Sequence, residues 1–109
     1  MEKNLEITIL FDIYGTLLTK RQRGVLEQYY EFDNSLAEIA EMLQISRQSV
    51  RDSIVSATEA LNRFESQLHL KDKFEKITNL ANVEIEKAEI ISNEETLARM
   101  NDILKILEE

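Results

Sequence analysis

Apolar residues in the first part of the chain recur at helical spacing. Leu5, Ile9, Ile13 and Leu17 follow one another four residues apart, and further apolar residues between them fill an adjoining stripe. A segment that is apolar around most of its circumference is typical of a helix that is buried on more than one side. We therefore predict a buried helix over residues 5–18.

Short polar signals mark the starts of the helices that follow. A Ser or Thr followed three residues later by Gln or Glu forms a capping box, in which each side chain accepts a hydrogen bond from the backbone N–H of the other residue. Three such pairs stand where we predict a helix to begin: Thr19 with Gln22, Ser35 with Glu38, and Ser92 with Glu95. Ser46 is predicted to cap a further helix that begins at Arg47. Together these signals predict a succession of helices joined by short polar connections.

The second half of the chain carries longer apolar stripes. From Val50 to Leu68, apolar residues alternate four and three positions apart, which is the heptad period of a helix that packs along a neighbour. The pattern continues beyond residue 70, and the sequence leaves open whether the helix breaks within 69–72. A last helix repeats the same period. We predict that these stripes pair two subunits, through Leu61, Phe64, Leu68, Leu97, Met100, Leu104 and Leu107.

Composition agrees with an all-α fold. The 109 residues include no proline and only two glycines, whereas hairpins and tight turns depend on these residues. The chain also has no cysteine, so it can form neither a disulfide nor a thiolate metal site. Its length is that of about one domain.

The segment 35–54, SLAEIAEMLQISRQSVRDSI, has the spacing of a helix-turn-helix. Ala40 is small, which lets the second helix cross close to the first. The left-handed turn position that is often glycine in such motifs is Gln44 here, at a cost of roughly 1–2 kcal/mol. We assign residues 1–70 to a helix-turn-helix domain and 71–109 to a C-terminal helical extension. The crossing is predicted to be fixed by Ile39, Leu43, Ile45, Val50 and Ile54.

The first turn of the second helix carries side chains that bond to base edges and phosphates in the major groove of DNA. No acidic residue lies between Gln44 and Arg51, although the chain has 21. The helix upstream begins with three cations suited to phosphate contacts, and cations are otherwise unfavourable at a helix N-terminus. The same residues could also form a solvated helix face. The predicted nucleic-acid contacts are Lys20, Arg21, Arg23, Ser46, Arg47, Gln48, Ser49 and Arg51.

The segment TKRQRGVLEQYYEFDNSLAEIAEMLQISRQSVRDSI resembles the helix-turn-helix of region 4 of bacterial sigma factors. With LFDIYGTLL before it and SATEALNRFESQLHL after it, residues 5–70 resemble the YlxM family of small bacterial proteins. The most specific runs are FDIYGTLLTKRQ, LAEIAE and ISRQSVRDSI. The resemblance implies an all-helical DNA-binding protein that is associated with the signal recognition particle pathway. It also implies that the C-terminal helices can pair between subunits.

Catalysis and metal binding find little support in the sequence. His69 is the only histidine, and without cysteine few pairs of nucleophile and base can be built. Two glycines cannot form a phosphate-binding loop or a dinucleotide fingerprint. We therefore expect that the protein is not an enzyme and that it has no catalytic residue, no metal site and no cofactor.

Charge and targeting signals leave three hypotheses open. The formal net charge of −8 opposes long-range attraction to nucleic acid, although the acidic excess is greater after Phe64. The N-terminus has no signal-peptide pattern, and no apolar stretch is long enough to span a membrane, so we expect a cytoplasmic protein. The first hypothesis is a regulator that binds duplex DNA as a homodimer. The second is an accessory factor that contacts signal recognition particle RNA or its GTPase protein. The third is a structural helical protein that does not bind nucleic acid.

Overall fold

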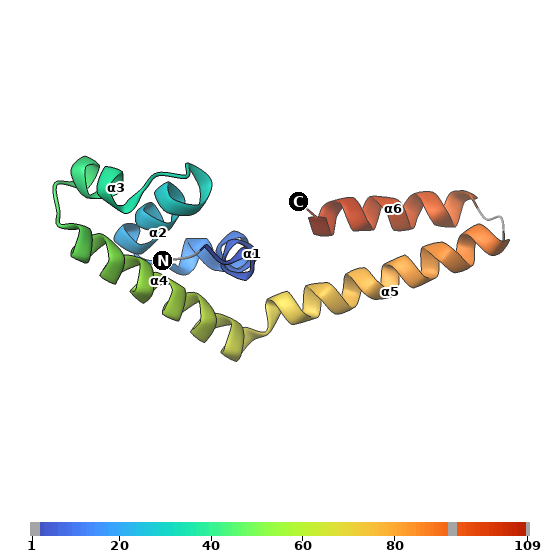
Figure 1. The fold of residues 1–109 in the computed structure, drawn as a ribbon. Helices are drawn as coiled ribbons and strands as arrows, with labels where there is room; N and C mark the ends of the chain where they lie inside the picture. The colour runs from blue at the N-terminus through green and yellow to red at the C-terminus, as the bar shows by residue number, and fades with distance from the viewer. Residues whose placement is uncertain (1–2, 92–93, 109) are drawn as a thin grey trace. The chain divides into compact units, whose positions relative to one another are not determined.

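The computed structural model describes residues 3–91 and 94–108, with side chains described outside 88–97. The described residues form no strand, which confirms the predicted all-α fold (Figure 1). The chain divides into two compact units, residues 1–69 and 70–109. The elements in order are α1 (Leu5–Tyr14), the 3-10 turn η1 (Gly15–Leu17), α2 (Lys20–Leu26), the π-helix η2 (Glu27–Glu31), α3 (Leu36–Leu43), α4 (Arg47–Leu68), α5 (Leu70–Ile91) and α6 (Glu94–Glu108).

The core of the first unit is built on α4, because α1, α2 and α3 all pack against this long helix. The heptad stripe predicted from Val50 onward supplies one side of the core, and residues up to Leu61 are buried within it. α1 is buried along one face only, through Ile7, Leu10, Phe11 and Tyr14, so the prediction of burial on more than one side is wrong. Leu5, Ile9 and Leu17 of the predicted first stripe are exposed, because the other elements pack on the opposite face. The largest fully buried side chains are Tyr14, Leu10, Leu26, Ile39, Leu61, Val25 and Val50.

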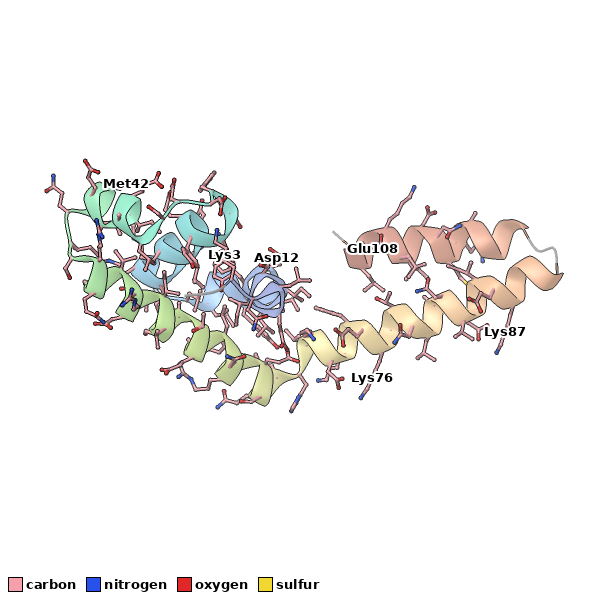
Figure 2. The ribbon with its side chains drawn as sticks, viewed as in Figure 1. Lys3, Asp12, Met42, Lys76, Lys87 and Glu108 are labelled. Atoms are coloured by element: carbon pink, nitrogen blue, oxygen red, sulfur yellow. The ribbon has the colours of Figure 1, made fainter. Side chains whose placement is uncertain are left out.

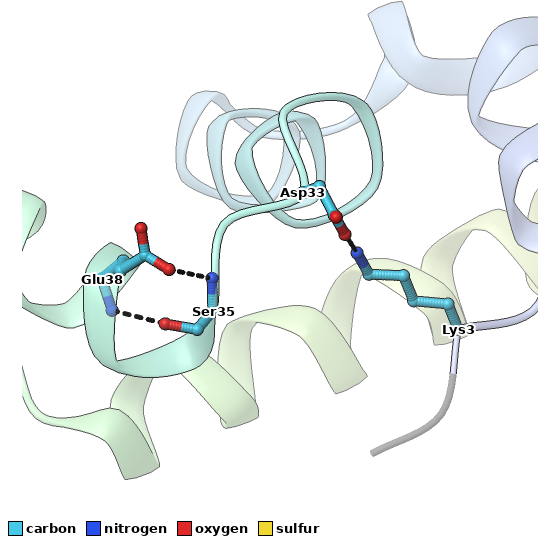
Figure 3. Close-up of polar contacts among 4 residues, drawn as sticks. All are labelled: Lys3, Asp33, Ser35 and Glu38. Carbon is cyan, nitrogen blue, oxygen red and sulfur yellow. Dashed lines mark hydrogen bonds and ion pairs between the residues drawn. The ribbon is translucent and has the colours of Figure 1, made fainter.

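Two predicted capping boxes are formed in full. The Thr19 side chain accepts from the backbone N–H of Gln22, and the Gln22 side chain accepts from the N–H of Thr19. Ser35 and Glu38 make the same reciprocal pair at the start of α3 (Figure 3). The third predicted box, at Ser92, lies outside the described residues. Local sequence therefore sets the start of both α2 and α3.

The segment between α1 and α3 departs from regular α-helix at both ends of α2. The predicted first helix ends at Tyr14 rather than continuing to residue 18, and η1 follows. A Cβ at Gly15 would come within 3.2 Å of the Phe11 ring, so glycine permits a close approach there. After α2 the chain widens into η2, a π-helix, which buries Tyr29.

Lys3, the first residue that the structure describes, contacts η2 and the connection after it. The Lys3 ammonium group forms an ion pair with the Asp33 carboxylate (Figure 3) and lies over the Tyr29 ring, 4.8 Å from its centroid. Asp33 has a left-handed backbone, with φ of 55°. These contacts hold Lys3 against η2 and the connection that leads into α3.

α4 ends at Leu68 and is capped by His69, whose φ of 55° and ψ of 31° are left-handed. The sequence leaves a break within 69–72 open, and the structure places it at His69. In the second unit, α5 and α6 pack against each other as an antiparallel hairpin (Figure 1). Lys76 and Lys87 point away from α6 (Figure 2), and each pairs with a carboxylate of its own helix.

Candidate nucleic-acid interface

The connection between α3 and α4 is a tight turn of three residues, Gln44 to Ser46. Gln44 is left-handed, with φ of 55° and ψ of 46°, so a residue other than glycine occupies the position that the motif predicts. The backbone N–H of Ile45 donates to the carbonyl of Ala40 at 3.0 Å. The hydroxyl of Ser46 accepts from the backbone N–H of Ser49 at 3.0 Å, which confirms Ser46 as the N-cap of α4.

The two helices of the motif cross over small and branched side chains. Ala40 and Ile39 of α3 are buried, as are Val50 and Ile54 of α4. These residues confirm the predicted crossing. Leu43 differs from the prediction, because its side chain remains 42% exposed at the end of α3. The crossing is therefore fixed mainly by the four buried residues, and the predicted Ile45 within the turn is half-buried.

The first two turns of α4 present polar side chains to solvent. Arg47, Gln48 and Arg51 are exposed, while Ser49 is half-buried. Ser46 is exposed, but its hydroxyl oxygen is engaged in the cap. The predicted contacts on α4 therefore separate into three accessible long side chains and two serines that shape the turn.

The structure adds an acidic residue to this surface. Asp52 is exposed, and its Oδ1 accepts a hydrogen bond of 2.8 Å from Nε2 of Gln48, four residues earlier on the same helix. The sequence prediction stopped at Arg51 and missed this contact. The four-residue spacing was the available signal, because residues i and i+4 are neighbours on a helix surface.

The start of α2 is held beside the middle of α4. Nε2 of Gln22 donates to the hydroxyl of Ser56 at 2.9 Å. Ser56 lies nine residues after Arg47, a distance of roughly 13 Å along a helix axis. Lys20 and Arg21 are exposed on the same first turn of α2, which places them closer to the middle of α4 than to Arg47.

Arg23 lies in a different setting from the other predicted cations. It lines a shallow surface cavity of about 220 Å³ between α1 and the segment formed by α2 and η2. Asp12, Glu27 and Glu31 line the same cavity. Arg23 therefore lies on a surface that it shares with three carboxylates, unlike Lys20 and Arg21.

The residues predicted to pair subunits fall into different environments. Leu61 is 0% exposed within the first unit, so it has no surface to offer a second subunit and is removed from the predicted set. Phe64 is half-buried, with its ring centroid 5.9 Å from that of Tyr14, and Leu68 is 43% exposed. The half-buried residues of α6 in this set are Met100, Leu104 and Leu107. The side chain of Leu97 lies outside the described residues.

Within the described part of the chain, neither a metal-binding cluster nor a membrane-spanning helix is found. No group of three or more His, Asp or Glu side chains there is placed to hold a metal ion. No helix among those residues is both long and apolar enough to cross a membrane.

The capped turn, the buried crossing and the exposed start of α4 together define a helix-turn-helix protein. A family described as "Putative helix-turn-helix protein, YlxM / p13 like" matches residues 1–104. The chain belongs to this family, UPF0122, which confirms the resemblance seen in the sequence.

Several bacterial UPF0122 proteins are similar to the chain. One from Thermoanaerobacter sp. (strain X514) is 44% identical over 105 residues, which cover 96% of this chain and 87% of the relative. One from Oceanobacillus iheyensis is 45% identical over 80 residues, covering 73% of this chain and 76% of the relative. One from Clostridium kluyveri is 48% identical over 73 residues, covering 67% of this chain and 66% of the relative.

Proposed function

We propose that the protein binds duplex DNA by placing the N-terminal half of α4 in the major groove. The observation that carries this proposal is the exposure of Arg47, Gln48 and Arg51 on the first two turns of a helix whose start is fixed by the turn and the Ser46 cap. Such side chains bond to base edges and phosphates when the second helix of the motif enters the groove.

The cations of α2 support the same docking. Lys20 and Arg21 lie on a helix that the Gln22–Ser56 hydrogen bond fastens to α4. In this arrangement they contact the phosphate backbone beside the groove and set the orientation of the protein, while α4 contacts the bases. Arg23 is left out of the proposed contacts, because it shares its cavity with three carboxylates.

The acidic composition weakens the binding but does not exclude it. Residues 1–69 contain seven basic and eleven acidic side chains, a net charge of −4, and residues 70–109 contain six and ten, also −4. Charges further than about 8 Å from a contact are largely screened at physiological ionic strength. The local cations of α2 and α4 therefore determine the contact, and we expect modest affinity with marked salt dependence.

RNA is the alternative ligand. The family resemblance implies a link to the signal recognition particle, and binding of that particle's RNA would account for this link. The same cations could contact RNA phosphates. However, the major groove of A-form RNA is too narrow and deep for side chains to read, so α4 would lose its role in base contacts. The shape of the motif favours duplex DNA.

A homodimer is the second part of the proposal. Ile77 and Leu80 of α5, and Ile103 and Ile106 of α6, are exposed, with Leu80 and Ile106 about two-thirds or more accessible. Both pairs lie on the outer surface of the hairpin, and solvent contact of so much aliphatic surface is unfavourable. Pairing of this hairpin between two copies would bury these side chains. It would also provide two recognition helices, which need to lie about 34 Å apart on DNA.

The proposal is tested by fluorescence anisotropy of a labelled mixed-sequence duplex across a salt series. We expect Arg47→Ala/Arg51→Ala to reduce affinity at least about ten-fold and to lower the magnitude of the salt slope by roughly 1–2. The matched control is Lys73→Ala/Lys105→Ala, which removes the same charge from exposed positions of the second unit.

Three results of this titration discriminate between the hypotheses. If Lys73→Ala/Lys105→Ala loses as much affinity as Arg47→Ala/Arg51→Ala, the contact is not localised on α4. Binding of a signal recognition particle RNA in preference to the duplex would favour the alternative. If neither nucleic acid binds at about 50 mM salt, where electrostatic binding is strong, the result would support the third hypothesis, a structural protein that does not bind nucleic acid.

A further inference from the structure

The side chain of Gln48 is held in place on the exposed surface of α4. Its Nε2 donates to Oδ1 of Asp52 at 2.8 Å, one helical turn further on. A long exposed side chain otherwise loses rotamer freedom when it binds, at a cost in affinity. The Asp52 contact reduces this cost by orienting the amide of Gln48 before any ligand arrives.

The hydrogen bond to Asp52 also determines which groups Gln48 can still offer. A glutamine amide has two N–H donors and one carbonyl acceptor. With one donor engaged by Asp52, one donor and the carbonyl oxygen remain on the amide. In the major groove, adenine presents the acceptor N7 beside the donor N6, whereas guanine presents two acceptors, N7 and O6. The remaining pair of groups on Gln48 complements adenine.

We propose that Gln48, positioned by Asp52, recognises an adenine in the major groove. This inference rests on the proposed DNA binding and goes further by naming the base. Asp52 acts as a positioning residue, since its carboxylate bonds Gln48 and not the DNA. Its negative charge also opposes binding to the phosphate backbone, so it lowers affinity for all sequences while it sharpens the choice of base.

The test begins with selection of duplexes from a random library by the full-length protein and four variants. Gln48→Ala removes the recognising amide, and Asp52→Ala removes its support. Asp52→Asn retains an oxygen that can accept from Gln48 but loses the charge. Glu59→Gln is the control, since it removes one negative charge from an exposed position two turns further along α4.

Each variant has a distinct expected result. The wild type and Glu59→Gln select an adenine at one position, with at least about five-fold preference over the other bases. Gln48→Ala loses that preference and keeps the rest of the selected sequence. Asp52→Ala binds all sequences more tightly and loses the preference, whereas Asp52→Asn binds more tightly and retains it.

A single-atom substitution in the DNA then tests the contact directly. The selected duplex is made with 7-deazaadenine, which lacks N7, at the preferred position. We expect this change to weaken binding of the wild type at least about five-fold and to leave binding of Gln48→Ala unchanged, because both changes remove the same contact.

Failure of adenine recognition can be distinguished from failure of DNA binding. If the protein binds DNA but Gln48→Ala selects the same bases as the wild type, adenine recognition is wrong and the proposed DNA binding stands. If no duplex binds any variant at low salt, both proposals are wrong. Equal loss of base preference in Asp52→Asn and Asp52→Ala would show that charge, and not support of Gln48, is the contribution of Asp52.

Discussion

Gln44 shows how a single residue can satisfy the geometry of the turn at a cost in stability. Its left-handed backbone connects α3 to α4. Glycine adopts this conformation without the steric penalty of a Cβ atom, although it loses more backbone entropy on folding. The motif thus holds its shape through the crossing and the caps and not through an ideal turn residue.

We expect Gln44→Gly to raise the free energy of unfolding by about 0.5–1 kcal/mol. Glycine relieves the steric strain of the left-handed backbone, and the added entropy of the unfolded chain offsets part of this gain. Urea unfolding followed by circular dichroism measures this change. The control is Glu59→Gly, at an exposed position inside α4, which should lower stability by about 0.5–1 kcal/mol. Destabilisation by Gln44→Gly similar to that of the control would contradict a left-handed turn at this position.

The ion pair of Lys3 and Asp33 changes the pKa of the Asp33 carboxyl group. The hydrogen bond from Lys3, and secondarily its charge, lower the pKa of Asp33 below the usual value for aspartate. A carboxyl group whose pKa is lowered by folding stabilises the folded state above its unfolded pKa of about 3.9. That contribution is lost as the pH falls through the lower pKa of the folded state.

Replacement of Lys3 tests this assignment. Lys3→Met should return the pKa of Asp33 toward its usual value, as measured by a carbon-detected NMR titration of the aspartate carboxyl groups. The wild type, titrated under the same conditions, is the reference. An unchanged Asp33 titration would mean that Lys3 does not contact it in solution.

The sequence predicted the helices of the first unit well because their signals are local. The capping boxes at Thr19 and Ser35 and the cap at Ser46 each involve residues three apart, and each is formed in the structure. The all-α fold follows from the scarcity of glycine and proline. Periodicity also identified the buried stripe of α4, since burial and helical spacing coincide along it.

The details that the sequence did not predict depend on contacts between elements. The π-helix η2 accompanies burial of Tyr29, and Arg23 joins a cavity that α1 also lines. The α1 side of this cavity, with Phe11 and Asp12, is distant from Arg23 in sequence, so no local pattern indicated it. Leu61 was misassigned for a related reason: a heptad stripe marks a buried helix face but does not show whether the neighbour belongs to the same chain.

The candidate interface was predicted in part. The positions of Arg47, Gln48 and Arg51 follow from the motif, and all three are exposed. Asp52 was missed although its four-residue spacing from Gln48 was a signal, because an acidic residue is unexpected on a DNA-binding surface. The nucleic-acid contacts themselves remain predictions that binding measurements must test.

We predict that the protein dimerises through the hairpin of α5 and α6. Sedimentation velocity at micromolar concentration should show a dimer for the wild type. Leu80→Asp/Ile106→Asp should shift it to monomer, because it places charges within the surface that pairing would bury. Leu5→Asp, at an exposed aliphatic position of α1, is the control and should leave the dimer intact. A monomeric wild type, with normal helical content, would contradict the pairing.

The location of DNA binding can be mapped across the molecule by titrating a short duplex into ¹⁵N-labelled protein and following amide shifts. We expect the largest shifts over residues 46–55 and at Lys20 and Arg21, with smaller shifts in the hairpin of α5 and α6. Shifts that diminish as salt is added would support contact with phosphates. Shifts confined to α5 and α6, or no shift at low salt, would contradict the assignment of α4 as the DNA-binding helix.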